Sequence, residues 1–248
     1  MTNAATFGRH FLALLFSLPG ALPAIAPWDR SPDQWTLADA YRVLQDSPWS
    51  PAGSKIEASW TQRHVDPQTH IVSNSPVNPE NTNITRGIEL SRSKPLPAVS
   101  VLWWSSKTVR LARQRLRQLR NSGGAGQILT AEDLPDYVLV IEGSEPLRIL
   151  RDAREDLRDV VFLELADGLT LDLGGVRFVD GTPDEDARVE FHFPRQNEGR
   201  PTLDANSERI VFHCRASAKT VRPGRQNAIS VRAEFQPRSM RVHGQPDL

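Results

Sequence analysis

The order of hydrophobic and polar positions changes at residue 98 and predicts the first elements of a folded body. Residues 98–106 (AVSVLWWSS) have the β-branched and aromatic content of a strand. Residues 107–120 (KTVRLARQRLRQLR) then place apolar side chains three or four positions apart, which is the spacing of a helix with one buried face. Ser106 is expected to cap this helix, because a serine oxygen accepts hydrogen bonds from the first amides.

The pattern from residue 137 to the end predicts a second helix and a series of strands. A strand at 137–142 precedes a helix that Ser144 begins, and the apolar residues of that helix again share one face. Short β-branched and aromatic runs follow, separated by turn pairs such as Asp167-Gly168. We therefore expect an α+β domain over residues 98–248, with two helices packed on one face of a mostly antiparallel sheet.

Two smaller regions precede this domain. Residues 27–54 contain one short amphipathic helical pattern between Trp35 and Trp49, which predicts an N-terminal helix docked outside the sheet. Residues 55–97 are expected to form a strand or hairpin followed by a connector. The connector, residues 73–97, is rich in Pro, Ser and Asn and has too few apolar side chains to form a core.

The first 26 residues have the pattern of a secretory signal peptide. An apolar run at 11–26 (FLALLFSLPGALPAIA) follows Arg9 and leads into a polar segment. The run is shorter than the roughly 20 apolar residues that span a bilayer. We expect cleavage between Gly20 and Ala26 and a periplasmic or secreted mature protein, with an uncleaved N-terminal anchor as the alternative.

Composition narrows the possible functions. The 248 residues include 30 Lys and Arg and 30 Asp and Glu, so the chain has no overall charge that would attract nucleic acid. Cys214 is the only cysteine, which excludes an intrachain disulfide. Because Cys214 lies in an apolar run, we expect it to be a buried hydrophobic residue.

The helix at 107–120 carries the strongest local charge in the chain. Its six basic residues include Arg110, Arg113 and Arg117, and it contains no acid. Such a helix could bind an anionic lipid or another polyanion. The alternative is the ordinary solvated face of an amphipathic helix.

Trp103 and Trp104 are a second candidate for binding. Neighbouring residues of a strand point to opposite faces, so one tryptophan can fill the core while the other lies at the surface. An exposed tryptophan could stack on a sugar or a partner. Burial against the N-terminal helix is the simpler interpretation, because tryptophan is highly buried on average.

His192 and His213 are the candidates for metal binding or acid–base chemistry. They occupy similar contexts, FHF and FHC, so pairing of their strands would bring both imidazoles to one sheet face near Glu190. Strand alternation alone also places polar residues on a solvated face. No residue is assigned a catalytic role, and no cofactor is expected.

Three segments carry a resemblance to a group of proteins. Residues 35–50 (WTLADAYRVLQDSPWS), 99–116 (VSVLWWSSKTVRLARQRL) and 189–195 (VEFHFPR) resemble uncharacterised exported proteins of acidobacterial type. The likeness spans most of the mature chain. Because that group has no assigned activity, the resemblance implies export and transfers no site residue.

These observations lead to three hypotheses about function. The first is a non-enzymatic protein of the periplasm or cell surface that binds an envelope protein or surface component. The second is an exported hydrolase or metal-binding protein that uses His192 and His213. The third is a binder of anionic lipid or polyanion through the Arg-rich helix. Membrane contact is expected only through an uncleaved signal segment or through that helix, and no nucleic acid partner is expected.

Overall fold

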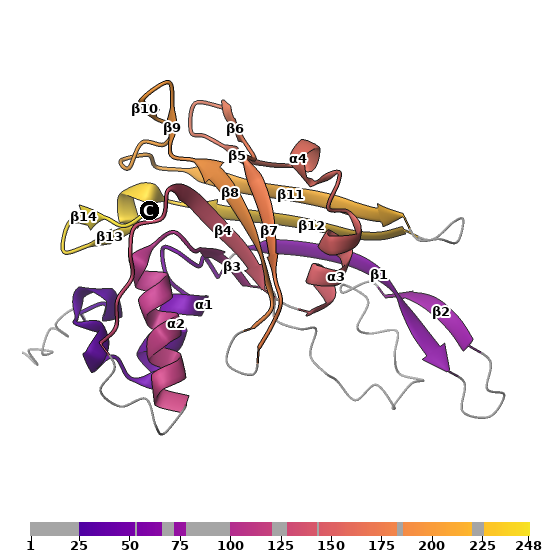
Figure 1. The fold of residues 1–248 in the computed structure, drawn as a ribbon, viewed down its shortest axis with the longest axis horizontal. Helices are drawn as coiled ribbons and strands as arrows, with labels where there is room; N and C mark the ends of the chain where they lie inside the picture. The colour runs from indigo at the N-terminus through magenta and orange to yellow at the C-terminus, as the bar shows by residue number, and fades with distance from the viewer. Residues whose placement is uncertain are drawn as a thin grey trace, which may run out of the picture.

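The computed structural model describes residues 25–52, 54–65, 72–77, 100–120, 128–142, 144–182, 186–219 and 226–248. It is an α+β protein built mostly from antiparallel strands, which confirms the predicted fold class (Figure 1). Nearly all of the predicted signal peptide and most of the 73–97 connector lie outside these ranges.

A six-stranded antiparallel sheet forms one layer of the protein. Its order is β2-β1-β12-β11-β5-β6. The strands are β1 (Lys55–Val65), β2 (Val72–Val77), β5 (Val161–Glu164), β6 (Thr170–Asp172), β11 (Ile210–Lys219) and β12 (Gln226–Phe235). The long β11–β12 hairpin runs through the middle of this sheet, so it joins β1 and β2 near the N-terminus to β5 and β6.

A four-stranded antiparallel sheet forms the second layer, in the order β3-β4-β8-β7. The strands are β3 (Ser100–Trp103), β4 (Asp136–Glu142), β7 (Gly175–Val179) and β8 (Arg188–Pro194). Glu142 faces Arg188 and Asp136 faces Pro194 along the β4–β8 pair. This register places the even-numbered residues of both strands on one face of the sheet.

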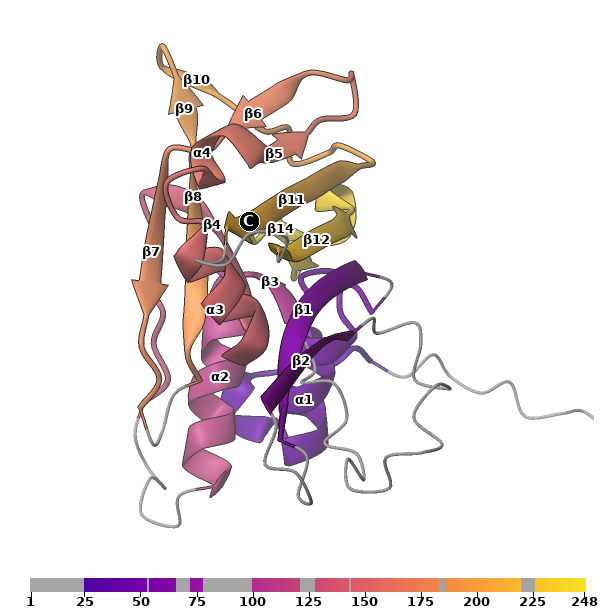
Figure 2. The same cartoon turned by 90° about the vertical axis from the view of Figure 1, so that its right-hand side faces the viewer.

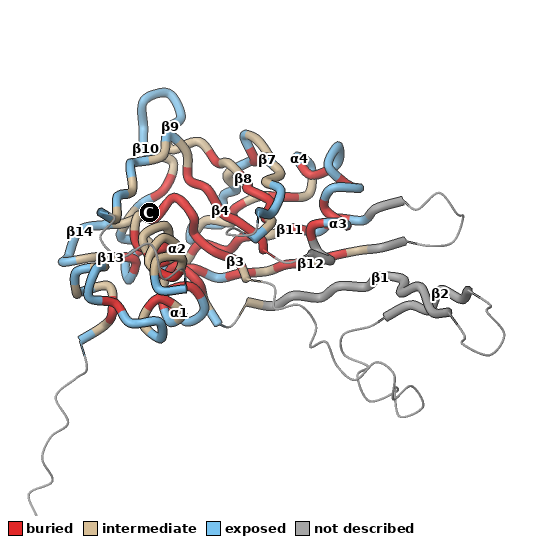
Figure 3. Tube along the Cα trace, turned by 60° about the horizontal axis from the view of Figure 1, so that its bottom comes forward, coloured by how far each residue is buried: buried red, intermediate tan, exposed pale blue. Residues whose placement is uncertain are grey.

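The two sheets pack against each other through aromatic side chains. Phe191 and Phe193 of β8 meet Phe212 of β11, with ring centres 5.4 Å and 6.5 Å apart. Trp103 of β3 meets Phe235 of β12 at 5.1 Å. All five side chains are buried. Figure 2 shows the two sheets packed against each other, and Figure 3 shows that buried residues gather on strands of both sheets.

Helices occupy two different places. The helices are α1 (Leu37–Gln45), α2 (Lys107–Arg120), α3 (Ser144–Asp152) and the short α4 (Leu157–Val160). The first two pack side by side near β3, whereas α3 contacts strands of both sheets (Figures 1 and 2). The predicted packing of two helices on one face of one sheet is not confirmed, because α2 packs against α1 and α3 contacts strands of both sheets.

Local sequence explains where α1 and α2 begin. Thr36 and Asp39 form a reciprocal capping box at the start of α1. Ser106 accepts a hydrogen bond from the Val109 amide at 3.3 Å, which confirms its predicted role as the cap of α2. The apolar face of α2, which includes Ala112, is buried. The helix is thus fixed by its cap and by packing together.

Short elements complete the surface. They are the 3-10 turns at Pro27–Asp29, Pro32–Gln34 and Pro237–Ser239, and the small hairpins β9 (Gln196–Asn197) with β10 (Arg200–Pro201) and β13 (Arg241–Val242) with β14 (Gln245–Pro246). Trp35 and Trp49 are buried, as their proposed packing role requires. The Trp49 indole N–H donates to the Asp247 carbonyl at 2.6 Å. This bond joins the N-terminal segment to the end of the described chain.

Cys214 is buried in the core between the sheets, as predicted. Burial raises the pKa of its thiol to about 12. The thiol is therefore protonated and shielded at neutral pH, so it acts as a small apolar side chain. As for membrane segments, none of the helices in the described residues has the length and apolarity that a bilayer span requires.

Candidate functional site

The structure does not bring His192 and His213 together. His192 lies on β8 between Phe191 and Phe193, and His213 lies on β11 between Phe212 and Cys214. These four neighbours point into the core between the sheets. Because strand side chains alternate, the two imidazoles project from opposite outer faces of the protein. The predicted cluster of two histidines is therefore wrong.

Each histidine instead has its own carboxylate partners. His192 lies 3.3 Å from Asp136 through Nδ1 and 3.6 Å from Glu190 through Nε2. The expected proximity of His192 to Glu190 is thus correct. His213 lies 2.9 Å from Glu164 and stacks on the Phe162 ring. Both imidazoles are part of local polar networks on the outer faces.

The Glu190 network is the more buried of the two. The Glu190 side chain is 2% exposed and accepts hydrogen bonds from Arg177 at 2.7 Å and Arg188 at 2.9 Å. Burial alone raises the pKa of this carboxyl, but the two arginine bonds outweigh burial and hold the pKa below its ordinary value. Glu190 is therefore a charged structural anchor for the arginines beside it.

The described residues do not support the predicted metal site. Across the ranges that the structure covers, no group of three or more His, Cys, Asp or Glu side chains is arranged to hold a metal ion. Asp136, Glu190 and His192 come nearest in composition. Their oxygens and nitrogens are engaged with each other and with arginine rather than pointing at a common centre.

The arginines of α2 hold the helix to the rest of the protein. Arg110 donates to the Ser105 and Glu132 carbonyls, and Arg113 forms ion pairs with Glu142 and Asp186. Arg117 also has an interaction within the chain. Two further arginines of the helix donate hydrogen bonds to the N-terminal segment, Arg115 to the Trp35 carbonyl and Arg120 to the Tyr41 hydroxyl. The geometry thus favours a structural role over a polyanion surface.

Trp103 and Trp104 point to opposite faces, as predicted, and both are buried. Trp103 fills the core between the sheets beside Phe235. Trp104 lies under the Arg188 guanidinium, whose central carbon is 4.6 Å from the ring centre. A cation over an aromatic face is attracted to the ring quadrupole. Neither tryptophan is exposed for stacking on a ligand, so their predicted binding role has no support.

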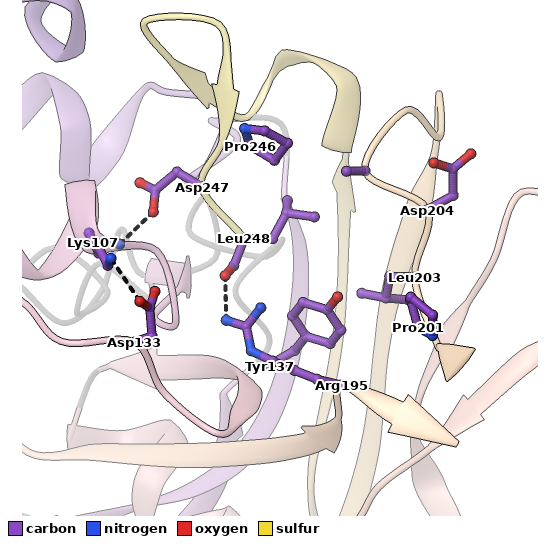
Figure 4. Close-up of a pocket in the computed structure, with 11 residues that line it drawn as sticks. Lys107, Asp133, Tyr137, Arg195, Pro201, Leu203, Asp204, Pro246, Asp247 and Leu248 are labelled. Atoms are coloured by element: carbon purple, nitrogen blue, oxygen red, sulfur yellow. Dashed lines mark hydrogen bonds and ion pairs between the residues drawn. The ribbon is translucent and has the colours of Figure 1, made fainter. Parts of the chain in front are cut away.

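A pocket of about 690 Å³ lies where distant parts of the chain meet. It is bordered by the start of α2, the start of β4, the residues after β8 and β10, and the end of the described chain (Figure 4). Its lining residues are Lys107, Asp133, Tyr137, Arg195, Pro201, Leu203, Asp204, Ala205, Pro246, Asp247 and Leu248. We define this cavity as the C-terminal pocket.

Arg195 lies at the centre of the C-terminal pocket. Its guanidinium stacks on the Tyr137 ring at 4.4 Å and donates to the oxygens of Leu134 and Leu248, at 3.0 Å and 2.6 Å. Tyr137 is itself largely buried, and burial raises the pKa of its hydroxyl. The hydroxyl therefore remains a protonated hydrogen-bond donor at neutral pH.

Asp247 fixes one wall of the pocket. Its carboxylate accepts from the Lys107 amide at 2.8 Å, from the Thr108 amide at 2.9 Å and from the Ser106 hydroxyl at 2.7 Å. A carboxylate at these amides satisfies the free donors of a helix start and complements its positive end. The end of the chain is therefore anchored to α2.

Sequence reasoning missed the C-terminal pocket altogether. Its residues are spread over 142 positions, from Lys107 to Leu248, and no motif joins them. Asp247 gave no signal, because it caps a helix 140 residues earlier in the chain. In the sequence, Lys107 belongs to the basic helix at 107–120 and Tyr137 begins a predicted strand, and neither pattern indicates a pocket.

Comparison with protein-family models, with curated proteins and with solved structures finds no match to this chain.

Proposed function

We propose that this chain is a non-enzymatic binding protein of the periplasm or cell surface, and that it binds its partner molecule in the C-terminal pocket. The observation that carries the proposal is the composition of that pocket. Apolar surface from Leu203, Leu248 and Pro246 lies beside a few polar groups from Arg195 and Tyr137. This mixture is typical of ligand sites, in which apolar contact gives affinity and a few polar groups give orientation.

The rigidity of the walls also supports binding there. Asp247 is held by three hydrogen bonds at the start of α2, and Arg195 is held between the Tyr137 ring and two backbone oxygens. A preformed pocket binds with a smaller loss of side-chain entropy than one that must order on binding. The hydrolase and metal-binding alternative has less support, because His192 and His213 are on opposite outer faces.

A fragment screen tests the proposal. We expect amide shifts at Tyr137, Leu203 and Leu248 when the isotope-labelled protein is titrated with a library of small acids, amines and neutral aromatics. Ala205→Trp should fill the pocket and abolish those shifts. Ala166→Trp, in an exposed turn outside the pocket, is the matched control and should leave them intact. Amide shifts that persist in Ala205→Trp, or the absence of shifts at these residues in the native chain, would contradict the proposal.

Export is proposed from the apolar run at residues 11–26. When the full chain is produced in a Gram-negative host, we expect the purified protein to be found in the periplasmic fraction. Its measured mass should correspond to a chain that starts between Gly20 and Ala26. Recovery of the intact chain from the membrane fraction would support the anchor alternative, and recovery from the cytosol would reject both.

A further inference from the structure

We infer that the ligand of the C-terminal pocket carries a single carboxylate on an apolar body, an inference that rests on the proposed binding function. The argument starts from the donors of the pocket. A guanidinium has five N–H groups. Arg195 uses Nε for the Leu134 carbonyl and Nη2 for the Leu248 oxygen and also hydrogen-bonds the Tyr137 hydroxyl, so these three acceptors leave two of its five N–H groups for a ligand. Its planar fork matches the geometry of a carboxylate.

Two further donors lie in the same pocket. The Lys107 ammonium pairs with Asp133 at 2.9 Å, but the Asp133 side chain is 84% exposed. An ion pair this exposed is weak, so the ammonium can also serve an incoming anion. The Tyr137 hydroxyl, which remains protonated, is beside Arg195 and faces the side of the pocket formed by Leu203 (Figure 4).

The acids of the pocket limit the charge of the ligand. Asp247 is occupied by the amides and hydroxyl at the start of α2, and Asp133 pairs with Lys107. Asp204 is exposed at the opposite rim, where one oxygen accepts from the Asn206 amide. Three acids beside two cations repel a doubly charged phosphate more than a carboxylate with one charge. A cationic ligand would instead meet Arg195 and Lys107 directly.

The remaining lining selects for an apolar body. Leu203 and Leu248 are buried, and Pro201 and Pro246 border the opening. A branched aliphatic chain next to the carboxylate would cover these side chains while the charge lies at Arg195. Two kinds of molecule carry a carboxylate on such an aliphatic body: a free aliphatic carboxylic acid and the C-terminus of a peptide that ends in leucine.

Matched acid and amide probes test the inference. Binding is measured by amide shifts at Tyr137 and Leu203 for isocaproate against isocaproamide, and for N-acetyl-glycyl-leucine against its C-terminal amide. We expect each acid to bind about tenfold more tightly than its amide, because hydrogen bonds from a cation to a charged acceptor are stronger than those to a neutral one. The tighter of the two acids identifies the source, either a free acid or a peptide terminus.

Three variants give a pattern that a purely structural effect would not produce. Lys107→Gln and Tyr137→Phe should each weaken the acid by about threefold to tenfold and change amide binding little. Asp204→Asn should strengthen the acid by about twofold, because it removes a like charge from the rim and keeps the oxygen that accepts from Asn206. Unfolding curves of each variant serve as the control for folding.

The outcomes separate the two proposals. The carboxylate inference would be overturned if each acid and its amide bound equally tightly, or if the fragment screen favoured amines. Either result would leave the proposed binding function in place. No shift at the pocket for any probe, with the variants folded, would overturn both. Opposite effects of Lys107→Gln and Asp204→Asn on the acid alone would support both.

Discussion

Phe212→Ala is expected to lower the free energy of unfolding by about 3–5 kcal/mol, the usual cost of removing a fully buried aromatic ring. Phe212 is fully buried and its ring meets those of Phe191 and Phe193 across the two sheets. Neither sheet can collapse into the cavity, because each is held by its own backbone ladder. Urea denaturation followed by tryptophan fluorescence measures the loss.

Phe162→Ala is the matched control for this prediction. Phe162 lies on β5 of the same sheet but on its outer face, where it stacks on His213. Its removal should cost about 1 kcal/mol or less, as for most partly exposed positions. A similar loss in both variants would show that the packing of the two sheets is not what stabilises the protein.

Glu190→Leu is expected to cost about 3 kcal/mol, the lower end of the range for breaking a buried ion pair from one side. The leucine removes the Glu190 carboxylate that pairs with the largely buried Arg188 guanidinium at 2.9 Å. Glu142 is close enough to affect Arg188 electrostatically, which moderates the loss. Arg177 also loses its partner, but its side chain is 65% exposed and water can replace the carboxylate.

A double variant separates the charge effect from simple misfolding. Glu190→Leu combined with Arg188→Met replaces the pair by apolar groups, and it should be more stable than Glu190→Leu alone. If the double variant is less stable than the single one, the loss of the Glu190–Arg188 ion pair is not the cause of the lower stability. Urea midpoints and slopes of the three proteins make this comparison.

The effect of Glu190 should depend on pH in a defined direction. Because the two arginines hold the folded-state pKa of Glu190 below its unfolded value of about 4.3, the stabilisation is fully present above that value. It is lost as the pH falls through the folded-state pKa. The stability difference between the native chain and Glu190→Leu should therefore shrink on acidification below about pH 4.

Local patterns in the sequence were sufficient for several features. Helical spacing and the Ser106 cap predicted α2, and short β-branched and aromatic runs between turns predicted the strands that carry Phe191 and Phe212. Strand alternation predicted that Trp103 and Trp104 face opposite sides, although β3 ends at Trp103 and Trp104 lies in the turn that follows. The apolar run around Cys214 predicted its burial. These features depend on residues a few positions apart, so one stretch of sequence contains the information.

The candidate sites were predicted less well, because they depend on which strands become neighbours. His192 and His213 have matching sequence contexts, but β8 and β11 belong to different sheets, so alternation sends the imidazoles outward on opposite sides. The sequence shows the charge of the Arg-rich helix correctly. It does not show that the arginines contact groups of the same chain, such as Glu142 and Glu132, because only folding brings these partners near.

The sequence by itself determined the α+β class, the positions of α2 and the main strands, and the burial of Cys214, because periodicity and capping act within a few residues. Only the tertiary structure decided the division of the strands into two packed sheets and the position of α3 against both. It also decided the C-terminal pocket, where Asp247 caps a helix 140 residues away. Contacts between residues so far apart leave no local pattern. The sequence around an aspartate is the same whether its side chain caps a distant helix or faces solvent.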